Sequence, residues 1–102
     1  MDKATPLTVL ARLKAKPGKE QELRRVLEGL LKPTRLEDGC INYELHCHDE
    51  DPSEFMFYEN WTGKRHLDQH LDSSHIHAFK ARADELLVKP VDITLWRKVP
   101  AN

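Results

Sequence analysis

A carboxylate and three imidazoles stand close together in the middle of the chain, in the stretch FMFYENWTGKRHLDQHLDSSH at residues 55–75. Phe55, Phe57 and Trp61 occupy alternate positions, which indicates a strand with one apolar face. Glu59 belongs to the same series. Because an unpaired buried carboxylate is costly, we expect Glu59 to be paired with a histidine or with the N–H groups at a helix N-terminus.

The histidines of this stretch are His66, His70 and His75. His66 and His70 are four positions apart and could share one face of a helix. Imidazole titrates near neutral pH, so such groups can exchange protons. The spacings typical of zinc sites, H-E-x-x-H and C-x-x-C, do not occur in the sequence, and we expect no metal centre.

These residues depend on a regular order of secondary-structure elements. We predict strands at residues 7–15, 41–48, 55–62 and 91–99 from alternating apolar positions. A helix is predicted at residues 19–32, ended by Pro33, and a helical region around Leu67 and Leu71 follows the third strand. Ser73 and Ser74 indicate a break and a cap before a last helix that carries Ile76, Phe79, Ala83, Leu86 and Leu87.

The order β-α-β-β-α-β is typical of the ferredoxin-like sandwich, an α+β fold with helices on one face of an antiparallel sheet. A chain of 102 residues suits one domain, residues 1–102. Large side chains on the other face of the sheet favour a homodimer that covers this face with a second copy.

Charge and hydropathy exclude several classes of protein. The 16 basic and 17 acidic residues are spread along the chain without a basic run, so we expect no nucleic-acid partner. No apolar stretch is long enough to span a membrane, and MDKATPLTV lacks a signal-peptide core. We therefore expect a cytoplasmic protein with reduced thiols. Cys40 and Cys47 cannot bridge if both lie on one extended strand, because they are then too far apart.

Three segments resemble a known family: PGKEQELRRVLEGLLKPTRLEDGCINYEL, ENW and HLDSSH. The most specific part combines E-x-W (Glu59, Trp61) with H-x-x-S-x-H (His70, Ser73, His75), and PTR-x-E-x-GC at residues 33–40 supports it. Over residues 7–96 the chain resembles the quinol-monooxygenase-like branch of the antibiotic biosynthesis monooxygenase superfamily.

This resemblance implies a ferredoxin-like fold and a homodimer in which the two sheets meet face to face as a barrel. It also implies a pocket between sheet and helices in each subunit. Members include cofactor-free oxygenases of phenolic polyketides or quinols, haem-degrading enzymes and an isomerase of a phosphorylated signalling sugar. The haem-degrading branch has an asparagine on the first strand, which LTVLARLKA at residues 7–15 lacks.

The resemblance therefore predicts a cofactor-independent monooxygenase that oxidises a phenolic or quinol-like molecule with O2. In such an enzyme His70 or His75 would be the base, and Glu59 would orient the imidazole. Trp61 and Tyr43 would wall the substrate ring, and Asn60 would donate a hydrogen bond. Asn60 can join Glu59 in one cavity only if a β-bulge intervenes, because neighbouring residues of a strand face opposite sides.

Three alternatives remain open at this level. On the same scaffold, an isomerase or decarboxylase of a small polar metabolite, phosphorylated or not, would use the same histidines to move protons between carbons. A dimeric module that only binds a ligand would need no catalytic group. Trp61 and Glu59 can also be purely structural residues. An apolar, aromatic pocket favours an aromatic substrate, whereas a cluster of Arg and His favours a phosphorylated one.

Overall fold

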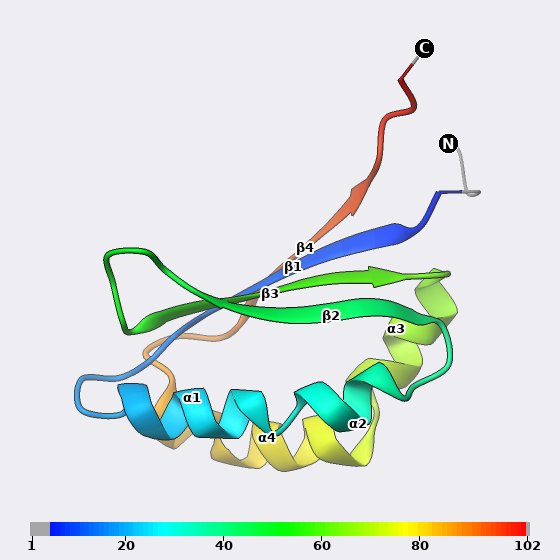
Figure 1. Cartoon of the computed structure of the whole chain (residues 1–102). Helices are drawn as coiled ribbons and strands as arrows, with labels where there is room; N and C mark the ends of the chain where they lie inside the picture. Colours follow the sequence, from blue (N-terminus) through cyan, green and yellow to red (C-terminus); the bar gives the residue numbers. More distant parts are fainter. Residues whose placement is uncertain (1–4, 102) are drawn as a thin grey trace.

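The computed structural model describes residues 5–101, in which a sheet lies over a layer of helices (Figure 1). The strands are β1 (Leu7–Lys14), β2 (Cys40–Cys47), β3 (Glu54–Trp61) and β4 (Asp92–Arg97), and the helices are α1 (Glu20–Glu28), α2 (Leu31–Arg35), α3 (Lys64–Leu71) and α4 (Ser74–Leu86). The four strands form one sheet in the order β2-β3-β1-β4, with every neighbouring pair antiparallel. This arrangement confirms the predicted ferredoxin-like α+β fold.

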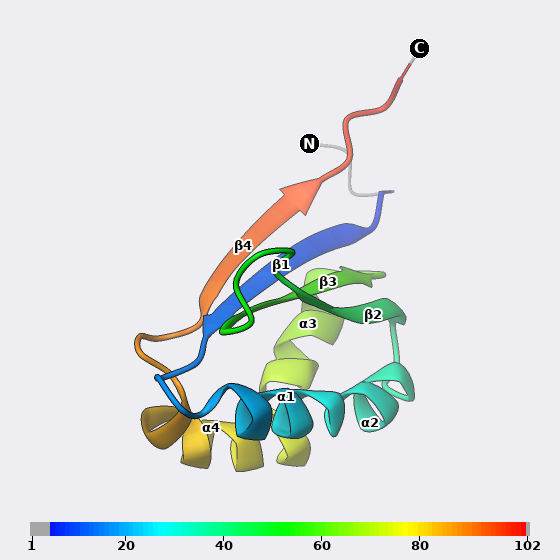
Figure 2. The ribbon, with the colours of Figure 1, turned by 60° about the vertical axis from the view of Figure 1, so that its left-hand side comes forward.

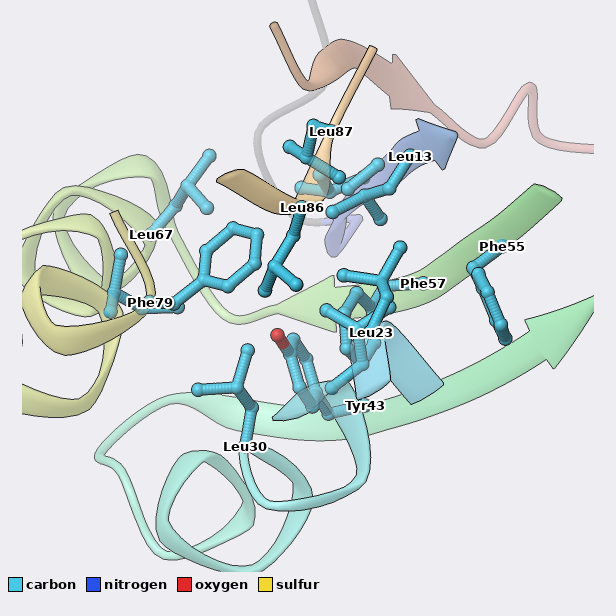
Figure 3. Packing of buried hydrophobic residues seen from close by; sticks show 14 of the residues in the cluster. Leu13, Leu23, Leu30, Tyr43, Phe55, Phe57, Leu67, Phe79, Leu86 and Leu87 are labelled. Atoms are coloured by element: carbon cyan, nitrogen blue, oxygen red, sulfur yellow. The ribbon is translucent and has the colours of Figure 1, made fainter. Parts of the chain in front are cut away.

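The helix-facing side of the sheet is built by alternate residues of the two central strands. On β3 the buried side chains are Phe55, Phe57, Glu59 and Trp61. The antiparallel register places Val9 of β1 opposite Glu59, so the carboxylate lies in the middle of the sheet rather than at its edge. Helix side chains cover this face, among them Leu23 and Leu30 from the first helical segment and Phe79 and Leu86 from α4 (Figure 3).

The first helical segment is interrupted, contrary to the single helix predicted at residues 19–32. It forms α1 and α2, with Gly29 as the C-cap of α1 and Leu30 as the N-cap of α2. Pro33 was expected to end the helix, but it lies inside α2, in the first turn. Proline is tolerated there because the N–H it lacks would have no helical acceptor.

The last strand is an edge strand, and it leads away from the helical layer (Figure 2). Ile93 and Leu95 pair with Ala11 and Val9 and share their side of the sheet, yet the two side chains are 42% and 46% exposed. The strand is also shorter than the predicted range 91–99. Ile93 and Leu95 therefore lie on the helix-facing side of the sheet, at an edge that the helices of this chain leave partly uncovered.

Cys40 and Cys47 are free and lie at the two ends of β2, too far apart for a disulfide. Within residues 5–101, no helix has the length and apolar character needed to cross a membrane.

Candidate active site

A cavity of about 130 Å³ lies between the sheet and the helical layer. Its walls are mostly apolar and include Ala11 of β1, Phe57 of β3, and Ile76 and Phe79 of α4. The polar or charged residues that line it are Tyr43, Glu59, His70 and Lys80. An apolar enclosure with a few converging polar groups is the usual form of a small-molecule site.

Tyr43 forms one aromatic wall of this cavity. Its ring stacks on Phe57 with the centroids 4.4 Å apart, and its hydroxyl points toward the space beside Leu30 and Phe79 (Figure 3). Burial raises the pKa of the phenol well above its usual value, an effect that the neighbouring Thr34 hydroxyl opposes. The Thr34 hydroxyl itself makes no hydrogen bond of ordinary geometry with the described residues. Tyr43 is therefore a neutral hydroxyl inside an apolar cavity.

Glu59 is a buried carboxylate, 3% exposed, that accepts a hydrogen bond from the indole Nε1 of Trp61 at 2.9 Å. Burial raises the pKa of Glu59 to about 7, the bond from Trp61 lowers it, and the charge of Glu37 raises it. We expected Glu59 to pair with a histidine or a helix N-terminus. Its side-chain partner is instead the indole of Trp61, two residues further along the strand. Near neutral pH, Glu59 can either accept or release a proton.

His70 is the imidazole of the cavity. Its side chain is 3% exposed and packs against Trp61, with the ring centroids 4.8 Å apart. Its Nδ1 lies 2.8 Å from Oε2 of Glu37, and Nε2 of His75 lies 2.7 Å from the same oxygen. Burial lowers the pKa of His70, whereas the hydrogen bond and charge of Glu37 raise it.

The turn between α2 and β2 holds Glu37 in place. The backbone N–H of Glu37 bonds to Thr34 O at 3.0 Å, and the Glu37 carbonyl accepts from Cys40 N at 3.2 Å. Gly39 follows with a φ of +78°, a left-handed conformation that favours glycine, and its carbonyl accepts from Thr62 N at 2.9 Å. The turn is therefore fastened to the end of β3.

The break between α3 and α4 positions the two histidines. His70 is near the end of α3, and His75 is in the first turn of α4. Ser73 is the N-cap between them, as predicted. Its Oγ accepts from Ile76 N and donates to the carbonyl of His70, at 3.4 and 2.7 Å. The cap thus fixes the end of one helix to the start of the next and places both imidazoles near Glu37.

The candidate residues predicted from the sequence do not all line the cavity. Tyr43, Glu59 and His70 line the cavity. Trp61 is fully buried and contacts both Glu59 and His70. His75 does not line the cavity but contacts Glu37 and faces the ring of His70.

Asn60 lies on the opposite face of the sheet. There it bonds to Thr8 and Asn42, at 2.6 and 3.0 Å. The β-bulge of this region is in β2, between Cys40 and Asn42, so it does not turn Asn60 toward the cavity.

Glu37 is the site residue that our sequence reasoning did not single out. It was visible as the glutamate of PTR-x-E-x-GC, but nothing in its local pattern relates it to a histidine. Together, Glu37, His70 and His75 offer three ligand atoms within 4.8 Å of one another, a donor set that could also hold a metal ion. The expectation that no metal binds stays a prediction.

The site is thus a mostly apolar cavity under a ferredoxin-like sheet, with Tyr43, Glu59 and His70 in its wall. The family model described as "Antibiotic biosynthesis monooxygenase" matches residues 6–82. The chain therefore belongs to the antibiotic biosynthesis monooxygenase family.

Several known proteins are similar to this chain over most of its length. "Putative monooxygenase Rv0793" of Mycobacterium tuberculosis is 35% identical over 91 residues, which are 89% of this chain and 89% of that protein. The crystal structure of PA3566 from Pseudomonas aeruginosa is 32% identical, with a TM-score of 0.91 over 98% of this chain and 100% of the other. The uncharacterized protein sll1783 of Synechocystis is 30% identical over 90% of this chain, which spans 63% of that longer protein.

Proposed function

We propose that this protein is a cofactor-independent monooxygenase that oxidises a single-ring phenol or quinol with O2. The observation that carries the proposal is the apolar cavity that brings Tyr43, Glu59 and His70 together. An apolar cavity of about 150 Å³ is known to accommodate benzene, so the roughly 130 Å³ present here matches one aromatic ring better than a fused polycyclic system.

In the proposed reaction, Nε2 of His70 removes the phenolic proton, because a phenolate is a far better one-electron donor to O2 than the phenol. Electron transfer gives superoxide and a ring radical, which combine to form a C–O bond and a peroxide. Loss of the ring proton and cleavage of the O–O bond then yield a quinone and water. All four electrons that reduce O2 come from the substrate, so no flavin or external reductant is required.

Two further groups are placed to assist this reaction. Glu59, whose pKa is raised to about 7 by burial, can protonate the oxygen that leaves as water. The Tyr43 hydroxyl can donate a hydrogen bond to the phenolate or the peroxide. Trp61 holds Glu59 and packs on His70, so its part is to position both groups.

The character of the cavity favours an aromatic substrate over a phosphorylated one. Among the described residues that line it, Lys80 is the one lysine and no arginine occurs, and the Nζ of Lys80 donates to the carbonyl of Leu71 at 3.2 Å. A phosphate would require several positive charges or N–H donors. The isomerase alternative therefore has less support than the oxidation of a phenol.

We also propose that the protein acts as a homodimer whose sheets meet face to face. Tyr58 and Trp96 project from the side of the sheet opposite the helices and are 37% and 55% exposed. Burying large apolar side chains of this kind against a second copy is favourable. Light scattering on the purified protein should give twice the mass of the chain. A monomer at all concentrations would contradict this proposal.

Oxygen uptake tests the proposed activity. Native protein is mixed with single-ring and two-ring quinols in the presence of catalase and superoxide dismutase, and His70→Gln is compared with His77→Gln. His77 is an exposed residue that bonds to Asp72, which makes it a matched control. We expect His70→Gln to lower kcat/KM at least about tenfold and His77→Gln to change it less than about twofold.

Isotope-labelled O2, supplied without catalase, identifies the reaction type. A monooxygenase places one labelled atom in the quinone and the other in water. An oxidase gives hydrogen peroxide and no label in the product. Absence of enzyme-dependent uptake with all the quinols, or peroxide in place of labelled quinone, would refute the proposed function.

A further inference from the structure

One carboxylate oxygen joins the two histidines of the site. Oε2 of Glu37 lies 2.8 Å from Nδ1 of His70 and 2.7 Å from Nε2 of His75. Glu37 is 16% exposed, whereas the His70 side chain is 3% exposed and the His75 side chain 20%. Exposure therefore increases from His70 at the cavity wall to Glu37 and His75.

The contact between Nδ1 of His70 and the Glu37 carboxylate determines which tautomer of His70 fits the structure. An ionised carboxylate only accepts hydrogen bonds, so both imidazole nitrogens that contact Oε2 must carry a hydrogen. In neutral His70 the hydrogen is then on Nδ1, and the lone pair is on Nε2. Nε2 makes no hydrogen bond within residues 5–101, and the ring lines the cavity, so this lone pair is available to a substrate.

We propose that Glu37 is a positioning residue that keeps His70 in the tautomer with a free Nε2 and stabilises the imidazolium formed when His70 takes a proton. This inference rests on the proposed function, because it assumes that His70 is the base. It assigns the base to His70 rather than His75, whose Nε2 is occupied by Glu37 and which does not line the cavity. His75 is then the second donor, which keeps Oε2 in place.

The other charged and titratable groups described around His70 make no side-chain hydrogen bond to its ring. Glu59 of β3 bonds to Trp61, and Tyr43 of β2 contacts His70 edge to face with the centroids 5.3 Å apart. From α4, His75 faces His70 with the ring centroids 6.0 Å apart. Glu37 thus makes the one side-chain hydrogen bond to the His70 ring within the described residues.

The same three groups could instead hold a metal ion, because their ligand atoms lie within 4.8 Å of one another. Both nitrogens lie at hydrogen-bond distance from the same oxygen, as expected when each carries a hydrogen. A metal would instead require that the two nitrogens lose those hydrogens and direct lone pairs at a common point outside the carboxylate. Metal content is therefore measured as part of the test.

The decisive measurement is nitrogen NMR of labelled histidine in the native protein, Glu37→Gln and a control, Glu50→Gln. Glu50 is an exposed turn residue whose backbone, not its side chain, bonds to His48. We expect a protonated Nδ1 and a free Nε2 on His70 in the native protein and Glu50→Gln, and a mixture of tautomers in Glu37→Gln. A native His70 with hydrogen on Nε2, or signals that are identical in Glu37→Gln, would overturn the proposal.

Kinetics provide a second readout, which a merely structural role would not move. Removing the charge of Glu37 should lower kcat at least about tenfold and change KM less than about threefold. In Glu37→Gln the acidic limb of the pH profile of kcat/KM should shift to lower pH, because the native Glu37 raises the pKa of His70 and the variant loses this effect. His75→Leu should shift this limb the opposite way, because His75 lowers that pKa.

The two proposals fail in distinguishable ways. If the native protein takes up no O2, the proposed function is wrong, and the NMR measurement still decides whether Glu37 sets the tautomer of His70. If NMR shows the wrong tautomer while uptake depends on His70, only the role of Glu37 is wrong. One equivalent of bound divalent metal in native protein, absent from Glu37→Gln, would show a metal centre and overturn the positioning role.

Discussion

Trp61 donates its indole N–H to the carboxylate of Glu59 at 2.9 Å, between two side chains on the same buried face of β3. This contact explains how a carboxylate can lie in the middle of an apolar sheet face. One donor only partly compensates for the lost water, and burial still raises the pKa of Glu59 to about 7. The protein therefore has a carboxyl group that changes charge near neutral pH beside its cavity.

The first prediction concerns the stability of Glu59→Gln as a function of pH. The folded-state pKa of about 7 exceeds the ordinary value of 4.5, so the folded native protein binds more protons than the unfolded chain between these values. Native stability should therefore carry no penalty from Glu59 below about pH 4.5, lose about 3 kcal/mol as the pH rises from about 4.5 to about 7, and change no further above that range. Glu59→Gln lacks this loss.

Urea unfolding of both proteins across this range measures the difference. We expect the free energy of unfolding of Glu59→Gln, relative to the native protein, to rise by about 3 kcal/mol between about pH 4.5 and pH 8. Glu50→Gln should show no comparable trend, because its carboxyl group is exposed. A constant difference between Glu59→Gln and the native protein would show that Glu59 titrates normally.

The second prediction compares two tryptophans. Trp61→Phe removes the donor to buried Glu59, and we expect it to destabilise the fold by about 2–4 kcal/mol at neutral pH through the lost bond and packing. Trp96→Phe removes a similar bond to Thr94, but Trp96 is 55% exposed, so its cost should be below about 0.5 kcal/mol. Equal costs in urea unfolding would contradict the role assigned to Trp61.

The third prediction concerns the turn that carries Glu37. A Cβ on Gly39 would lie 2.2 Å from the ring of His66, whereas a Cβ on Gly18 would meet no atom within 4 Å. Both glycines have positive φ, so alanine at either position costs about 1 kcal/mol of backbone strain. Gly39→Ala must in addition displace His66.

We therefore expect Gly39→Ala to lower the melting temperature clearly more than Gly18→Ala. It should also disturb the His70 signals in nitrogen NMR, because Glu37 is two residues away on the same turn. Equal melting temperatures for the two variants would mean that the turn and α3 can separate without cost.

The fourth prediction concerns the cap between α3 and α4. Ser73→Ala removes both the cap to Ile76 N and the bond to the carbonyl of His70, and should cost about 1–2 kcal/mol in urea unfolding. Ser74→Ala, at the exposed neighbouring position, should cost less than about 0.5 kcal/mol. The reverse order would show that the helix starts at a different residue.

Local patterns predicted much of the fold. The alternation of Phe55, Phe57 and Trp61 correctly identified a strand with a buried face that includes Glu59. The pair Ser73-Ser74 correctly marked the break between two helices. These predictions hold because strand and helix periods, and the preference of serine for a cap, depend on neighbouring residues alone.

The candidate site was predicted less completely. His70 and Glu59 were identified as site residues, but Glu37, 33 positions before His70, was not. Residues in a turn have no periodicity that indicates a distant partner. The predicted partner of Glu59, a histidine or a helix N-terminus, was wrong for a related reason. The side-chain rotamer that brings the Trp61 indole to the Glu59 carboxylate depends on the packing around both residues.

The sequence by itself determined the order of the elements, the apolar face of each strand and the family, because these follow from short-range patterns and motifs. Only the tertiary structure decided that His70 lies in the cavity, that Trp61 binds Glu59, and that Asn60 faces away. The physical reason is that these relationships depend on how the helices dock on the sheet. That docking is a collective result of core packing, which no single segment encodes.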